Sequence, residues 1–313
     1  MTMMTLEDAT DYVGAMIRQE RKFYRCSDYL DADEPGPVVS PLHVVFECAN
    51  LVTDVRGPPA SEKEASLLRS PTRVSNFPSP RSSFSDLGTA VTDTYSSRSS
   101  SRGQTELSFI SSWRHQMLDW ASTVTLTYNV DRETIPVAFS ILDRYLAVEL
   151  ASHQEPIDRE DFQLFAMVSM YIAIKILVPF RKLALETLID MSRGFYTAED
   201  VTATEQDILV ALDWHLHPPI VMEYCRCFMK LFPSELPSEV EETCAYISEM
   251  ALDDTYFISK PTSLVALAAM LVAAHRHNIS LNLTQGFLEN LMGHMDVHSA
   301  EFDAILRRME VLC

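Results

Sequence analysis

The chain has 313 residues, 47% of them hydrophobic, and its 44 acidic against 25 basic side chains give a formal net charge of -19. That length exceeds what one hydrophobic core usually organises, so we expect two domains or one domain with appendages. The acidic balance repels phosphate backbones and anionic lipid heads, which argues against nucleic acid and membrane surfaces as partners.

From Thr5 to Tyr29 the spacing of apolar residues predicts an amphipathic helix, within a first segment of residues 1–30. Thr5 is the candidate N-cap, and Glu7 and Asp8 in the first turn suit the helix dipole. The start of the chain has no basic stretch followed by an apolar one, so we expect a soluble, intracellular protein.

Residues 31–106 form an insert, and from Arg56 to Ser112 the sequence is crowded with Ser, Thr and Pro. Such a composition buries too little apolar surface to offset the entropy of ordering, so we expect a largely disordered linker. Before it, the apolar run Leu42 to Val55 is too short for periodicity to choose between a helix, a strand and a docked segment.

From Leu107 onward helical signals are dense, and only eight glycines occur in the chain, which favours an all-α fold. Turn residues near positions 129, 152, 178, 194 and 218 delimit five helices in a domain of residues 107–217. A second domain of residues 218–313 shows five more, at Val221–Phe232, Pro237–Asp253, Thr262–Asn278, Leu283–Met292 and Ser299–Leu312. The segments around Phe162–Val178 and Thr262–Ala274 are apolar nearly all round, as expected of central helices.

Two segments carry a resemblance to a known family. Residues 113–120 (WRHQMLDW) look like the opening helix of a cyclin box, and residues 134–146 (TIPVAFSILDRYL) look like its second helix. The segments 247–253 and 260–266 resemble the entry to the central helix of the second cyclin bundle. The resemblance implies tandem five-helix bundles in a non-enzymatic subunit that binds and activates a cyclin-dependent protein kinase and so controls cell-cycle progression, in nucleus and cytoplasm.

The same resemblance assigns roles to individual residues. Arg114 and Asp143 match a buried structural ion pair, in which the loss of either side chain would strand a charge. Lys175 and Glu205 match an electrostatic clamp on the kinase, for which a solvated surface pair is the alternative. The apolar part of the kinase contact would come from Leu209, Trp214 and Leu216, and from Tyr12 and Ile17 of the first helix.

A groove for Arg-x-Leu substrate peptides is matched only in part. Trp113, Met117, Trp120 and Gln163 could line it. Gln116 stands where the family has an aliphatic residue, and Thr123 and Thr127 stand where acids would face the peptide arginine. Because charge-assisted contacts to that arginine are lost, we expect weak or altered docking.

Several features leave alternatives open. Ser70 and Ser79 precede prolines near basic residues, a pattern that proline-directed kinases favour but that also arises by chance in such a segment. A cyclin-fold transcription regulator or another interaction scaffold is the alternative function, and the cyclin subtype is not resolved.

No phosphate loop or nucleophile elbow occurs in the sequence. The six cysteines form no CxxC pair, so we expect free thiols. We expect no cofactor and no metal, because the candidate pairs lack further ligands: His294 with His298, His215 with His217, and Cys225 with Cys227.

Overall fold

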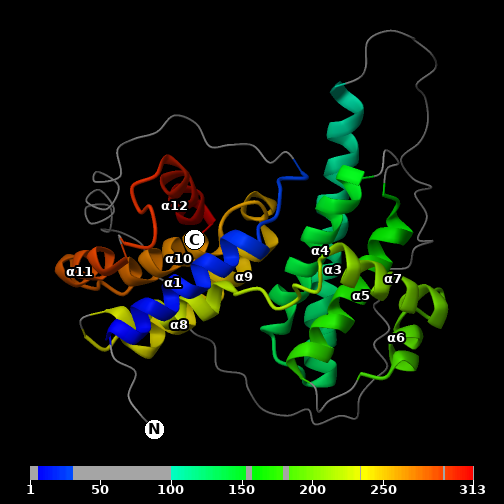
Figure 1. Cartoon of the computed structure of the whole chain (residues 1–313), viewed down its shortest axis with the longest axis horizontal. Helices are drawn as coiled ribbons and strands as arrows, with labels where there is room; N and C mark the ends of the chain where they lie inside the picture. Colours follow the sequence, from blue (N-terminus) through cyan, green and yellow to red (C-terminus); the bar gives the residue numbers. More distant parts are fainter. Residues whose placement is uncertain are drawn as a thin grey trace, which may run out of the picture. The chain divides into compact units, whose positions relative to one another are not determined.

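The computed structural model describes residues 6–30, 100–152, 157–178, 183–232, 234–291 and 293–312 (Figure 1). Within these ranges the regular structure is entirely helical, which confirms the all-α prediction. The described residues fall into two compact units. The first bundle comprises residues 26–30 and 100–218, and the second bundle comprises residues 6–25 and 219–312.

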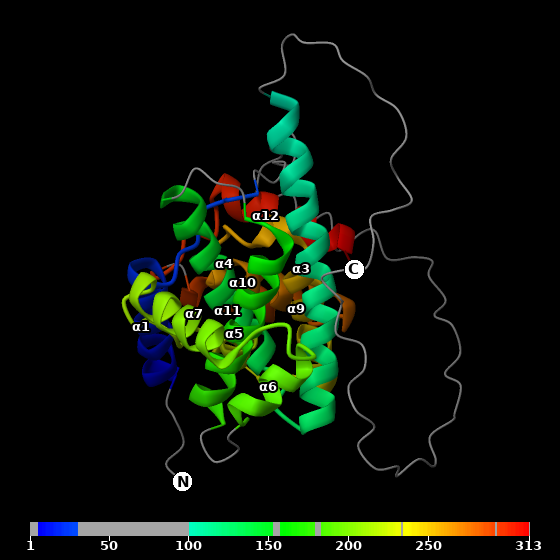
Figure 2. The same ribbon diagram turned by 90° about the vertical axis from the view of Figure 1, so that its right-hand side faces the viewer.

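The first bundle has α5 at its centre, where it contacts three of the other helices. Its buried residues include Phe162 and Gln163 and those from Ala166 to Met170 and from Ile172 to Ile174, in line with the predicted apolar pattern. The N-terminal turns of α3 project beyond the other helices of the bundle (Figures 1 and 2). The five helices are α3 (Ser100–Tyr128), α4 (Thr134–Ser152), α5 (Arg159–Leu177), α6 (Leu185–Met191) and α7 (Ala198–Ala211).

Local capping explains where helices α5 and α7 begin. Asp158 caps α5, because its carboxylate accepts from the backbone N–H of Asp161 at 2.8 Å. A capping box opens α7: Thr197 Oγ1 accepts from the N–H of Asp200 at 3.2 Å, and Asp200 Oδ2 accepts from the N–H of Thr197 at 2.8 Å. These bonds satisfy backbone donors that would otherwise lack partners at a helix start.

The second bundle is built around α10, in which every residue from Ser263 to Ala274 is buried. It contacts α8, α9 and α12, so the second central helix is also confirmed. The short helix η1 between α9 and α10 was not predicted. The elements are α8 (Val221–Leu231), α9 (Ser238–Asp253), η1 (Thr255–Phe257), α10 (Thr262–Arg276), α11 (Leu281–Leu291) and α12 (Ala300–Leu312).

The first helix, α1 (Leu6–Phe23), packs on α8 and α10 of the second bundle. Its apolar stripe of Ala9, Val13, Met16 and Ile17 is buried. Glu20 continues this stripe and is only 2% exposed. Its carboxylate accepts from the Tyr224 hydroxyl at 2.8 Å and from the Ser263 N–H at 3.2 Å, so a charged residue is buried with its hydrogen bonds satisfied.

Two predicted boundaries were wrong. The first helix ends at Phe23 rather than near Tyr29, because Tyr29 and Leu30 leave the helix and become part of the first bundle. Helix α3 begins at Ser100, inside the segment that we expected to be disordered. A Ser-rich composition has poor but not prohibitive helix propensity, and the helix continues into the apolar residues that follow. Thr5 and the run Leu42–Val55 lie outside the described residues.

Candidate functional site

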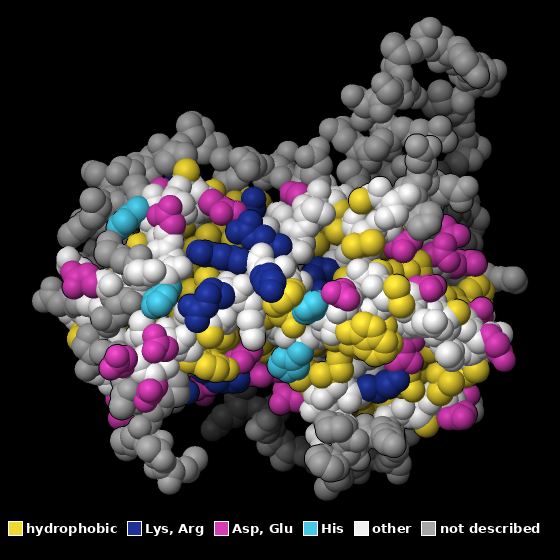
Figure 3. All heavy atoms as spheres, in the orientation of Figure 1, with side chains coloured by type: hydrophobic (Ala, Val, Ile, Leu, Met, Phe, Trp, Pro, Cys, Tyr) yellow, Lys and Arg dark blue, Asp and Glu magenta, His cyan; other side chains and the backbone are white. Residues whose placement is uncertain are grey.

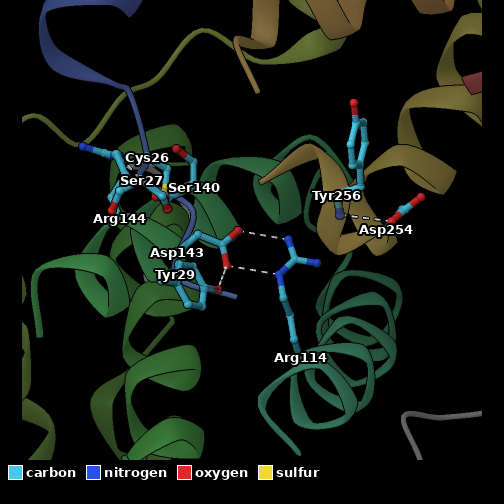
Figure 4. A network of polar contacts seen from close by, with 9 residues as sticks. All are labelled: Cys26, Ser27, Tyr29, Arg114, Ser140, Asp143, Arg144, Asp254 and Tyr256. Atoms are coloured by element: carbon cyan, nitrogen blue, oxygen red, sulfur yellow. Dashed lines mark hydrogen bonds and ion pairs between the residues drawn. The ribbon is translucent and has the colours of Figure 1, made fainter. Parts of the chain in front are cut away.

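The buried centre of the first bundle holds the predicted Arg114 and Asp143 together (Figure 4). Arg114 donates from Nε to Asp143 Oδ1 at 3.1 Å and from Nη2 to Oδ2 at 3.0 Å, which is a bidentate pair. The two residues are 2% and 6% exposed. The guanidinium also lies 5.2 Å from the centroid of the Phe139 ring. This buried geometry joins α3 to α4 within the first bundle.

A third member of this network comes from the segment after α1. The Tyr29 hydroxyl donates to Asp143 Oδ1 at 2.7 Å (Figure 4). Burial and the nearby Asp143 carboxylate raise the pKa of Tyr29 well above its ordinary value, so the phenol keeps the proton that it donates. Tyr29 thereby fastens the extended segment to the first bundle.

Lys175 and Glu205 form a direct ion pair between α5 and α7. The Lys175 side chain is 45% exposed and that of Glu205 is 19% exposed. Lys175 Nζ also lies 4.8 Å from the centroid of the Tyr171 ring. A partly exposed pair of this kind contributes at most about 1 kcal/mol to folding, so its main physical effect is to present paired charges at the surface.

Helix α7, which carries Glu205, ends in an unusual turn. Trp214 is 68% exposed and has φ 60°, and Asp213 before it has φ 48°. Left-handed backbone is unfavourable for residues other than glycine, so the turn needs support. Arg144, which directly follows Asp143, supplies part of it by donating from Nη1 to the His215 carbonyl at 2.9 Å.

An apolar surface accompanies the turn. Val210, one helical turn before Trp214, is 65% exposed, while Leu209 and Leu216 are half-buried. Figure 3 shows hydrophobic side chains gathered on the exposed face of the first bundle, over the region of α5 and α7. Large exposed apolar side chains that neighbour one another are typical of protein interaction surfaces. The paired charges of Lys175 and Glu205 lie on the same two helices.

The two predicted contact residues of α1 differ in accessibility. Tyr12 is 46% exposed, and its hydroxyl donates to Glu223 Oε1 at 3.3 Å. The expectation for Ile17 is corrected: it is 2% exposed, because it lies on the stripe that packs against the second bundle. Ile17 therefore stabilises the docked helix and presents no surface to a partner.

The predicted docking groove is also corrected. Met117, Trp120 and Gln163 are 1%, 3% and 2% exposed, so they belong to the core and do not line an open surface. Trp113 is half-buried, 5.8 Å from the Phe162 ring. Gln116, which stands where the family has an aliphatic residue, accepts a hydrogen bond of 3.2 Å at Oε1 from Arg159 Nη2.

The remaining predicted sites have no structural test. Ser70 and Ser79 lie outside the described residues. In the part of the chain that the structure describes, no group of three or more His, Cys, Asp or Glu side chains could hold a metal ion. No helix in that part is long and apolar enough to span a membrane.

Sequence reasoning missed three contributors. Val210 was not predicted, because the helices that pack against α7 decide which of its sides is exposed. Arg144 lies in the segment 134–146 that carries the family resemblance, directly after Asp143, and this position was its only signal. Glu20 gave a usable signal: it is an acidic residue on the otherwise apolar stripe of an amphipathic helix.

Comparisons with known proteins match this fold. The family model described as "Cyclin, N-terminal domain" matches residues 89–217, and "Cyclin, C-terminal domain" matches residues 219–313. Among curated relatives, Cyclin-A3-4 of Arabidopsis thaliana is 26% identical over 51% of this chain and 42% of its own length. G2/mitotic-specific cyclin-B1 of Caenorhabditis elegans is 26% identical over 53% of this chain and 46% of its own length.

A solved structure agrees at the level of fold. The X-ray structure of a viral cyclin from herpesvirus saimiri aligns with a TM-score of 0.50 and 18% identity, covering 65% of this chain and 86% of that one. The chain spans about half the length of the curated relatives it matches. Both cyclin domains are present in order, on two helical bundles with the expected central helices, and the chain therefore belongs to the cyclin family.

Proposed function

We propose that this chain is a regulatory, non-catalytic subunit that binds a cyclin-dependent protein kinase and switches it on. The observation that carries the proposal is that α7 and the turn that follows it present both a paired charge, Glu205 with Lys175, and the exposed apolar side chains Val210 and Trp214. Membership in the cyclin family supports a kinase partner, as do relatives titled G2/mitotic-specific cyclins.

The proposed contact combines two kinds of interaction. The apolar side chains near the end of α7 would be buried by a partner helix, and a large aromatic such as Trp214 is a frequent energetic centre of such contacts. The paired charges would select the partner's complementary polar groups and set the orientation of the complex. Residues 176–178 after Lys175 are Ile, Leu and Val and are half-buried, which makes this edge predominantly apolar.

Activation would follow from where this surface binds. A protein kinase is active when a glutamate of its regulatory helix pairs with the lysine that contacts ATP. A subunit that binds this arrangement better than the inactive one shifts the population towards it. The rigid bundle core, with its Arg114–Asp143 pair, would hold the surface in one shape for that purpose.

The test is affinity capture of the tagged full chain from its own cells, followed by a histone-kinase assay of the eluate. We expect the wild type to bring down kinase activity and the double variant Lys175→Ala/Glu205→Ala to lose most of it. The matched control is Arg226→Ala/Glu241→Ala, which removes an exposed ion pair of 3.1 Å from the second bundle.

A second pair of variants tests the apolar part. Trp214→Ala should reduce captured activity, whereas Tyr246→Ala, which removes another aromatic that is 55% exposed, should not. The proposal is wrong if the wild type captures no kinase activity. It is also wrong in its choice of surface if both ion-pair variants behave alike.

A further inference from the structure

The outward face of α1 carries a cluster of positive charge in an otherwise acidic protein. Arg18, Arg21, Lys22 and Arg25 are all exposed. Their spacing of three, four and seven residues places the first three on one face of the helix, opposite the buried stripe. Figure 3 shows Lys and Arg side chains gathered over the C-terminal half of α1. We call these four residues the basic face of α1.

The charges of this face are not neutralised within the part of the chain that the structure describes. None of the ion pairs found there includes Arg18, Lys22 or Arg25, although six others are present in the same residues. Arg21 donates only to a neutral acceptor, the His294 carbonyl, at 3.3 Å. In a chain of net charge -19, uncompensated arginines would be expected to find carboxylates.

Helix capping explains only part of this cluster. Basic residues in the last turn of a helix stabilise the negative end of its dipole, which accounts for Arg21 and Lys22. The dipole effect falls off within one turn, so it does not account for Arg18. Arg25 lies beyond the helix end at Phe23.

The helix that bears the face is held firmly in place. Glu20 is buried against Tyr224 and the first turn of α10, and Tyr12 donates to Glu223. Arg18, Arg21 and Lys22 therefore project from a helix that is held in place, which lowers the entropic cost of ordering them when a ligand binds. From Arg18 to Lys22 the helix rises about 6 Å, the length of about two residues in an extended peptide.

We propose that the basic face of α1 is a docking surface for an acidic linear segment of a partner protein, with carboxylates on alternate residues. Guanidinium groups bind carboxylates in bidentate fashion, and the Lys22 ammonium binds them as a point charge, so the basic face matches a run of Asp and Glu. Nucleic acid is disfavoured as the occupant, because the overall charge of the chain repels its phosphates. This surface belongs to the second bundle, whereas α5 and α7 belong to the first, and the proposal does not depend on the proposed kinase contact.

The test uses the full chain and fluorescence anisotropy with a short labelled peptide of alternating Asp and Glu. The test variant Arg18→Gln/Lys22→Gln/Arg25→Gln keeps Arg21, which has a structural bond to His294. The control variant Arg226→Gln/Lys230→Gln/Arg276→Gln removes the same charge from other exposed positions of the second bundle. Thermal melting confirms that both variants are folded.

We expect the wild type and the control to bind the peptide with Kd values within about twofold of each other, and the test variant to bind at least about tenfold more weakly. Binding should weaken as salt is raised, because exposed charges are screened. Equal losses in the two variants, no binding to the wild type, or tighter binding of a single-stranded oligonucleotide than of the peptide would each overturn the proposal.

Discussion

The Asp143 carboxylate connects three segments of the first bundle. It accepts two hydrogen bonds from Arg114 and one from Tyr29. Arg114 and Asp143 are buried and Tyr29 is half-buried. Such a pair gains little over an apolar core when intact, but removing one partner leaves a buried charge without compensation. The sequence predicted the pair by resemblance, and the structure adds the tyrosine.

We predict that Asp143→Ala lowers the free energy of unfolding by about 3–5 kcal/mol, because the Arg114 guanidinium stays buried without a carboxylate. Tyr29→Phe removes one neutral donor and should cost only about 1 kcal/mol. Urea titration of both variants, followed by circular dichroism, measures the difference. Similar losses in the two variants would show that the charge is not the cause.

At the scale of single elements, helix α7 shows how a local motif positions a functional side chain. The capping box of Thr197 and Asp200 defines where the helix starts, and Glu205 follows about one and a half turns later. Hydrogen bonds from the Thr197 N–H and hydroxyl lower the pKa of Asp200 below its ordinary 3.8. The ionised carboxylate is the form that caps the helix.

We predict that Asp200→Ala costs on the order of 0.5–1 kcal/mol at pH 7. A carboxylate with a lowered folded-state pKa contributes stability above pH 3.8 and loses it as the pH falls through the lowered value. The gap in Tm between wild type and variant should therefore be constant from pH 7 to about pH 5 and narrow below pH 4. The exposed neighbour Glu199 is the control, because Glu199→Ala breaks no capping bond of this kind. A gap that does not change with pH would contradict the assignment.

Helix α1 depends on close packing as well as on Glu20. A Cβ added to Gly14 would lie 2.8 Å from His294 Nδ1, which is too close for any side chain. The His294 ring therefore favours glycine at position 14, although glycine weakens a helix interior by about 1 kcal/mol relative to alanine.

We predict that Gly14→Ala lowers the Tm in the wild-type background and raises it in a His294→Ala background, where the ring is gone. Hydrogen exchange of the α1 amides should follow the same pattern, with faster exchange only when both the methyl group and the ring are present. A stabilising effect in both backgrounds would mean that the His294 ring moves aside at no cost.

At the scale of the whole molecule, the two bundles are not continuous stretches of the chain. Residues 6–25 are the first that the structure describes, yet they belong to the second bundle with residues 219–312. This bundle therefore depends on contacts between residues about two hundred positions apart, such as Glu20 with Tyr224. Closing so long a loop costs conformational entropy that these contacts must offset.

We predict that a chain lacking residues 1–25 keeps the first bundle and loses stability in the second, because the α8 and α10 surfaces under α1 become exposed. Hydrogen exchange with mass spectrometry should show faster exchange in α8 and α10 and little change in α4 and α5. Uniform acceleration in both bundles, or none in α8 and α10, would contradict this assignment of α1.

The sequence alone determined the helical class, the two sets of five helices and their bounds to within about two residues from Val221 onward, because helix periodicity, caps and turn residues are local signals. It also predicted, by resemblance, that Arg114 would meet Asp143, and it left a surface pair of Lys175 with Glu205 as the alternative to a clamp on a kinase. Only the tertiary structure decided that Ile17 and Trp120 are buried and that Tyr29 leaves its helix to bond Asp143. These outcomes depend on which residues far apart in the sequence pack together, and the spacing of residues within one segment does not determine that packing.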